Sequence, residues 1–180
     1  MLDDAFQPRR IERPPHPAAR APEALMAEVE IVKGRSGGPG GQHRNKVETL
    51  VLLRHLPTGI EATAGERRSA EDNRRVALRR LRLALATQHR EPVPTGDVRT
   101  DLWRSRVRGG RIQCATRHQD FPSMLAEALD VLWACGLDPK RAGLRLEATP
   151  SQLVKLLREH PAALAKLNDA RGSRGLHRFK

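Results

Sequence analysis

The 180-residue sequence has few aromatic side chains and few cysteines, and each shortage excludes a class of protein. Aromatic residues make up 3% of the chain and there is no tyrosine. Proteins that hold single-stranded nucleic acid by stacking bases on aromatic rings need more. Two cysteines, Cys114 and Cys135, cannot build a disulfide framework or a zinc site. We therefore expect no metal and no cofactor, and a reducing compartment.

Long hydrophobic runs are also missing. No apolar stretch approaches the roughly 18 residues that a membrane span needs. The N-terminal segment is basic, but it contains Asp3, Asp4 and Glu12, and mitochondrial transit peptides avoid acids. We expect a cytoplasmic protein with no membrane partner, and a mitochondrial location is disfavoured.

Acidic residues are scarce relative to basic ones, with 21 Asp and Glu against 33 Lys and Arg, a net charge of +12. An excess of this size is typical of proteins that bind nucleic-acid phosphates. The excess lies in residues 33–90 (net +8), 98–120 (net +4) and 171–180 (net +4), whereas 121–170 is neutral. A generally solvated basic surface is the alternative, and the uneven distribution argues against it.

The first half of the chain indicates a small α+β domain. Residues 1–24 contain five prolines without apolar periodicity and predict a disordered arm. A catalytic domain is expected over 25–90. Its expected elements are strands at Ala27–Val32, Glu48–Leu56 and Ile60–Ala64, and a helix from an N-cap at Ser69 to about Gln88.

The second half predicts a basic connector at 91–120, a helical extension at 121–170 and a basic tail at 171–180. Alternating arginines at 104–108 favour an extended segment with one basic face. In the extension we expect helices from Pro122 to Cys135, from a capping box at 149–152 to His160, and from Pro161 to Ala170. The oligomeric state is not indicated.

A glycine-dense segment, 34–42, lies between the first two expected strands and has five glycines in the eight residues before Gln42. Glycine reaches positive φ and lets the backbone approach a ligand closely. The segment is not a P-loop, because the nearby Lys46 follows Asn45 and no Gly-Lys-Ser/Thr is present. It is not a dinucleotide fingerprint either, because His43 stands where the last glycine belongs. A flexible surface hairpin would be the ordinary explanation for the glycines alone.

The run from Arg35 to Lys46, RSGGPGGQHRNK, resembles the GGQ domain of class I peptide chain release factors and of the smaller, codon-independent ribosome rescue hydrolases. Further matching blocks follow in order at His55–Ile60 and along the expected helix, at Ser69, Asn73, Arg74, Ala77 and Leu81. The resemblance covers roughly residues 27–88. It departs from the family pattern at Gly37, where serine is commoner, and at Arg44, where an apolar residue is usual.

The resemblance implies hydrolysis of the ester that joins the nascent peptide to tRNA. Gly40, Gly41 and Gln42 are the candidate catalytic residues. The two glycines would let the Gln42 backbone N–H face the ester, where negative charge develops, and the Gln42 side chain would admit water as the nucleophile. The implied partners are peptidyl-tRNA, ribosomal RNA and the peptidyl transferase centre of the large ribosomal subunit. His43 is expected to be structural or to contact RNA.

Candidate RNA-binding residues follow from the basic segments. They are Arg35, Arg44, Lys46, Arg74, Arg75, Arg104, Arg106, Arg108, Arg171, Arg174, Arg178 and Lys180. In the rescue hydrolases a basic tail enters the vacant mRNA channel, and 171–180 either does so or is a frayed terminus. Only about 26 proline-rich residues precede the expected domain, so we expect release without a stop codon. Two alternatives stay open: action on separated large subunits, and a ribosome-binding protein that lacks hydrolysis.

Overall fold

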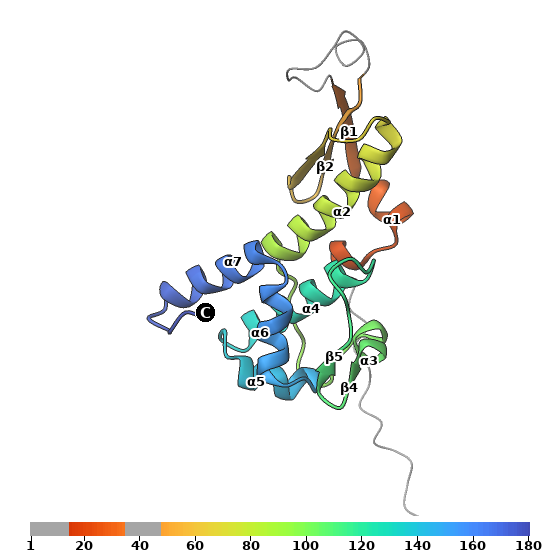
Figure 1. The fold of residues 1–180 in the computed structure, drawn as a ribbon. Coiled ribbons are helices and arrows are strands. Elements are labelled where there is room, and N and C mark those ends of the chain that lie inside the picture. The colour runs from red at the N-terminus through yellow and green to blue at the C-terminus, as the bar shows by residue number, and fades with distance from the viewer. Residues whose placement is uncertain (1–14, 35–47) are drawn as a thin grey trace, which may run out of the picture. The chain divides into compact units, whose positions relative to one another are not determined.

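The structure is a computed structural model that describes residues 15–34 and 48–180. It divides into two compact units, one of residues His16–His89 and one made mainly of Arg90–Lys180. The fold class is confirmed as α+β, because the first unit contains a three-stranded sheet and the second is mostly helical (Figure 1). Among the described residues, no helix is long and apolar enough to span a bilayer.

The first unit is built on an antiparallel sheet with strand order β1-β2-β3. Its strands are β1 (Val29–Gly34), β2 (Leu50–His55) and β3 (Glu61–Ala64), each within three residues of the expected limits. β2 is central and alternates, so that Val51, Leu53 and His55 are buried on one face. This face packs against α2 (Ala70–Gln88), which lies beside the sheet in Figure 1.

Helix α2 begins where the sequence predicts. The hydroxyl of Ser69 accepts a hydrogen bond from the backbone N–H of Asp72 at 3.0 Å, which satisfies one of the unpaired donors of the first turn. Ala77, Leu81 and Leu85 follow at a spacing of four residues and are fully buried. Arginines occupy much of the remaining surface of the helix, so one element supplies both core and charge.

The expectation of a disordered arm over 1–24 is wrong for its last ten residues, whereas residues 1–14 lie outside those that the structure describes. A short 3-10 helix η1 (Pro17–Ala19) is followed by α1 (Pro22–Met26). Ala18 is fully buried, and its carbonyl accepts a hydrogen bond from Arg82 Nε on α2 at 2.9 Å. The prolines start these helices instead of preventing them, because proline is favoured at a first helical position.

The second unit surrounds α4 (Phe121–Ala134), whose residues 121–132 are all buried. The other elements are α3 (Asp101–Arg106), the two-residue strands β4 (Val107–Arg108) and β5 (Arg111–Ile112), α5 (Pro139–Leu146), α6 (Pro150–Arg158) and α7 (Pro161–Gly172). Trp103 on α3 is fully buried and donates its indole N–H to the carbonyl of Leu146 at 2.8 Å. This bond fastens α3 to the end of α5.

The expectation of an extended segment at 104–108 is wrong, because α3 continues through Arg106. Thr100 caps this helix by accepting from the Trp103 N–H at 3.1 Å. The Thr100 hydroxyl also donates to buried Glu127 on α4 at 2.6 Å. These contacts stabilise a helix where the alternating arginines alone predict an extended segment. The strand begins only at Val107.

The residues after α7 fold back on this helix and are not frayed. Asn168 donates from its amide to the Phe179 carbonyl and accepts from the Phe179 N–H, both at 2.8 Å. The Arg171 guanidinium lies 4.0 Å from the centre of the Phe179 ring. The carbonyl of Lys180 accepts from Arg158 Nε at 2.6 Å. Side chains of α6 and α7 thus fix the position of the basic tail.

Candidate functional site

The glycine segment departs from the end of β1 and returns at the start of β2. The candidate catalytic residues Gly40, Gly41 and Gln42 lie outside the described residues, as do the candidate RNA-binding residues Arg35, Arg44 and Lys46. What the structure describes is the base of the segment, where Gly34 pairs with Leu50 in the antiparallel ladder. The sheet therefore fixes Gly34 and Leu50, the described residues on either side of the candidate catalytic segment.

Asn73 ties this base to α2. It is fully buried, and its amide donates to the Thr49 carbonyl at 2.6 Å and to the Arg67 carbonyl at 3.0 Å. Its side-chain oxygen accepts from the Arg67 N–H at 2.8 Å. One side chain thus joins the residue before β2, the connection after β3 and the first turn of α2. In the sequence, Asn73 stands out only as part of the family resemblance, and no local pattern predicts this role.

Exposed basic side chains gather at the same end of the unit. Arg74 and Arg75 lie on the exposed side of the first two turns of α2, and their contacts with Glu71 and Asp72 are loose, at 3.7–3.9 Å. Such exposed pairs contribute little, so phosphates can displace them. Arg67 and Arg68 are also exposed here and were missed as candidates. Their position beside the helix cap was the only signal for them in the sequence.

A buried histidine holds the turn at the opposite end of β2. The His55 ring is 1% exposed, with Nδ1 2.8 Å from the Thr58 hydroxyl and Nε2 3.2 Å from a Glu28 carboxylate oxygen. A hydrogen bond from Arg20, followed by that from His55, lowers the pKa of Glu28. His55 belongs to the block of the resemblance that ends at Ile60. Its contacts give it a structural role in the sheet.

The structure does not bring all of the candidate arginines of the second unit to one surface. Arg104 forms an ion pair with Asp97. Arg106 donates to Asp120 from Nε at 3.0 Å and from Nη2 at 2.7 Å. Arg108 is exposed on β4 and has no ion-pair partner among the residues that the structure describes. Of the three, only Arg108 can bind a phosphate without first breaking an ion pair within the described residues.

In the tail, Arg171 packs on Phe179, and Arg178 lies 3.5 Å from Asp169. Arg174 and Lys180 have exposed side chains. A role in binding RNA stays a prediction for all four residues.

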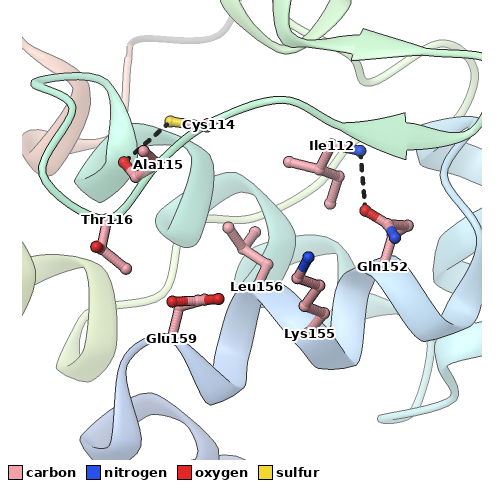
Figure 2. Close-up of a pocket in the computed structure, with 8 residues that line it drawn as sticks. All are labelled: Ile112, Cys114, Ala115, Thr116, Gln152, Lys155, Leu156 and Glu159. Atoms are coloured by element: carbon pink, nitrogen blue, oxygen red, sulfur yellow. Dashed lines mark hydrogen bonds between the residues drawn. The ribbon is translucent and has the colours of Figure 1, made fainter.

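A cavity of about 350 Å³ lies in the second unit between α6 and the segment after β5 (Figure 2). Cys114 lines this cavity, and burial is the largest cause that raises the pKa of its thiol. A raised pKa disfavours the reactive thiolate. No cluster of three metal-binding side chains occurs within 15–34 or 48–180. The cavity therefore offers no nucleophile or metal centre of its own.

Comparison with known proteins identifies the family to which the first part of the chain is similar. Residues 23–122 match the family described as the RF-1 domain. The chain is 35% identical over 153 residues to peptide chain release factor 1 of Chlorobaculum tepidum, covering 73% of this chain and 41% of that protein. It is 40% identical over 113 residues to the same-named protein of Chloroherpeton thalassium, covering 56% of this chain and 30% of that protein.

A third relative, peptide chain release factor 1 of Symbiobacterium thermophilum, is 39% identical over 101 residues, or 56% of this chain and 27% of that protein. The chain thus spans less than half the length of the curated relatives that it matches. The matched family region itself covers more than half of the chain, from before β1 to the start of α4. The chain belongs to the RF-1 domain family.

Proposed function

We propose that this protein hydrolyses the ester bond of peptidyl-tRNA on the ribosome and so releases the nascent peptide. The observation that carries the proposal is the intact Gly40-Gly41-Gln42 triplet on a segment whose two ends are paired at Gly34 and Leu50. The RF-1 domain match and the relatives named as peptide chain release factor 1 support it.

The chemistry needs an ordered water and a donor at the place where the oxyanion forms. The Gln42 backbone N–H is the donor, and the glycines before it permit a close approach without a Cβ clash. The Gln42 side chain restricts the nucleophile to water. No general base is required from this chain, because ribosomal RNA and tRNA supply the rest of the catalytic environment. Activity away from the ribosome should accordingly be slight.

Release by the 180-residue polypeptide is proposed to be independent of a stop codon. The aligned part of these curated relatives is at most 41% of their length, and the resemblance to the codon-independent rescue hydrolases supports the proposal. The basic charge of 33–90 and the exposed Arg74 and Arg75 supply affinity for ribosomal RNA. The cytoplasm, where translation takes place, is the proposed location.

The test is peptide release from purified ribosomes stalled on truncated mRNA, with and without a stop codon in the A site. Equal single-turnover rates in the two cases are expected. Release that requires the stop codon would contradict codon independence, and release unchanged by Gln42→Ala would contradict the catalytic proposal itself.

A second substrate is a separated large subunit that still holds peptidyl-tRNA. The observation that favours it is the neutral helical segment 121–170, which the simple pattern of a rescue hydrolase lacks and which is available to recognise a subunit surface. Faster release from isolated large subunits than from intact stalled ribosomes would select this substrate. Tight ribosome binding without release from either particle would indicate a non-catalytic binding protein.

A further inference from the structure

Helices α5 and α6 form a helix-turn-helix. The eight residues of α5 end at Leu146, three residues make the turn, and α6 begins at Pro150. Glu147 reverses the chain in the left-handed region, at φ 49°. Thr149 then caps α6 by accepting from the Gln152 N–H at 3.4 Å. Two helices joined by so short a turn are the arrangement with which many proteins dock on a nucleic-acid double helix.

The turn is held firmly against α5. Ala148 is 5% exposed, and the side chains of Leu146 and Leu153 on either side of it are fully buried. A Cβ at Gly143 would lie 2.5 Å from the Ala148 carbonyl oxygen, so only glycine permits this approach. The relative position of α5 and α6 is therefore fixed by packing.

A hairpin lies against the start of α6. β4 and β5 are joined by Gly109 and Gly110, at φ 55° and 74°, which is typical of a tight turn with positive φ at both central residues. The Gly110 carbonyl accepts from the Thr149 N–H at 2.9 Å. The Ile112 N–H donates to the side-chain oxygen of Gln152 at 3.2 Å, as Figure 2 shows. Side chains on the hairpin thus keep a constant position relative to α6.

The two strands place Arg108 directly opposite Arg111. Like charges at opposed positions of an antiparallel pair repel each other and destabilise the hairpin. Both side chains are exposed, and neither has an ion-pair partner in the described part of the chain. A bound polyanion would attract both guanidinium groups and so offset the repulsion between them.

Two lysines line separate grooves that each include a residue of the hairpin. Lys155 on α6 lines the 350 Å³ cavity that begins at Ile112 (Figure 2). Lys140 on α5 lines a groove of about 430 Å³ that begins at Gly110. Neither lysine has an ion-pair partner among the described residues. This distinguishes them from Arg104 and Arg106, whose charges are matched by aspartates.

The chemistry of this surface favours the backbone of a duplex over bases or single strands. No aromatic residue lies in the hairpin, α5 or α6 for bases to stack on. Gln152, the one carboxamide in α6, has its oxygen occupied by the Ile112 N–H, so it cannot make the paired contact that reads an adenine. Lys155 is a point charge suited to phosphate. A-form RNA is recognised mostly by shape and backbone, because its major groove is too narrow for side chains to read.

We propose that Arg108, Arg111, Lys140 and Lys155 form a surface that binds the phosphate backbone of double-helical RNA without reading its sequence. This surface belongs to the second unit and is separate from the ester chemistry of Gly40–Gln42.

The test is binding of the full chain to two fluorescent RNA hairpins of about 20 base pairs and unrelated sequence, measured over a range of salt. Arg108→Ala/Arg111→Ala should weaken binding to both hairpins by about tenfold or more and lower the salt slope by roughly two units, one for each lost phosphate contact. Lys155→Ala should lower the slope by roughly one unit. The matched control for the lysine variant, Lys166→Ala on α7, also removes one exposed charge and should leave both quantities nearly unchanged.

Thermal unfolding separates loss of contact from loss of fold. The double arginine variant should unfold at an unchanged or higher temperature, because it removes a like-charge pair. Equal weakening by Lys155→Ala and Lys166→Ala, no weakening by Arg108→Ala/Arg111→Ala, or tighter binding to single-stranded RNA or to duplex DNA would each overturn the proposal. Gln42→Ala should bind the hairpins like the wild type, so failure of the release proposal and failure of this one are distinguishable.

Discussion

Replacing Asn73 by alanine removes the side chain that joins the start of β2 to the start of α2. Three hydrogen bonds, of 2.6, 2.8 and 3.0 Å, are lost from a residue with no exposed surface. At about 1 kcal/mol for each bond, the free energy of unfolding of the first unit should fall by about 3 kcal/mol. That is a drop of roughly 100-fold in the protection of its amides.

Native-state hydrogen exchange at the amides of α2 measures this loss in the first unit alone. Release should also slow at a temperature where the variant is fully folded, because Thr49 and Arg67 lose the partner that fixes the base of the glycine segment. Leu85→Ala is the matched control, since Leu85 is fully buried near the other end of α2 and its truncation costs about 2–5 kcal/mol.

The outcome depends on the comparison of the two variants. Leu85→Ala should lose stability and keep the release rate of the folded protein, whereas Asn73→Ala should lose both. Equal release rates in the two variants would show that Asn73 acts only through stability. Protection that falls by less than about threefold would refute the assignment of three net-stabilising bonds.

The remaining predictions concern the candidate catalytic segment, the turn between α5 and α6, and the dependence of stability on pH. Gln42→Ala should abolish release at saturating protein while ribosome binding persists, and Gly41→Ala should be nearly as damaging because of its added Cβ; a preserved maximal rate in either variant would contradict the mechanism. Gly143→Ala should destabilise the second unit by about 1–3 kcal/mol in urea unfolding, because its Cβ would meet the Ala148 carbonyl, and unchanged stability would refute that contact. A hydrogen bond from Arg99 is the largest of the causes that hold the pKa of Asp97 far below its ordinary value of 3.8. The ionised carboxylate therefore stabilises the fold above pH 3.8, and this contribution is lost as the pH falls through the lowered pKa. Acid titration of Asp97→Asn should therefore show a flatter loss of stability below about pH 4 than the wild type, and identical curves would argue against it.

Local signals in the sequence were sufficient for the sheet and for helix α2 of the first unit. Ser69 caps α2 as expected because an N-cap acts through its own side chain on a donor three residues away. A strand was expected where β2 lies, and its buried face alternates because strand side chains point to opposite sides at every second residue. The prolines of the N-terminal segment predicted disorder, but η1 and α1 form because Ala18 and Leu25 are buried, and no local pattern reveals that packing.

The second unit was less predictable, because contacts between residues far apart in sequence determine where its elements form. α5 was not expected, since its eight residues are short and carry three basic side chains. The capping box at 149–152 forms only in part: Thr149 caps α6, but the Gln152 side-chain oxygen accepts from Ile112. Asp120 precedes α4 but makes no capping bond, and its carboxylate accepts from Arg106.

The sequence alone supplied the candidate catalytic triplet Gly40–Gln42, the family resemblance and the net basic charge, because these depend on residue identity and order. Only the tertiary structure decided which cations are available to a partner. It pairs Arg104 and Arg106 with aspartates, and it leaves Arg108 and Arg111 opposed on a hairpin beside α6. A charge acts on its surroundings through distance and burial, and neither is set until segments far apart in the chain have packed together.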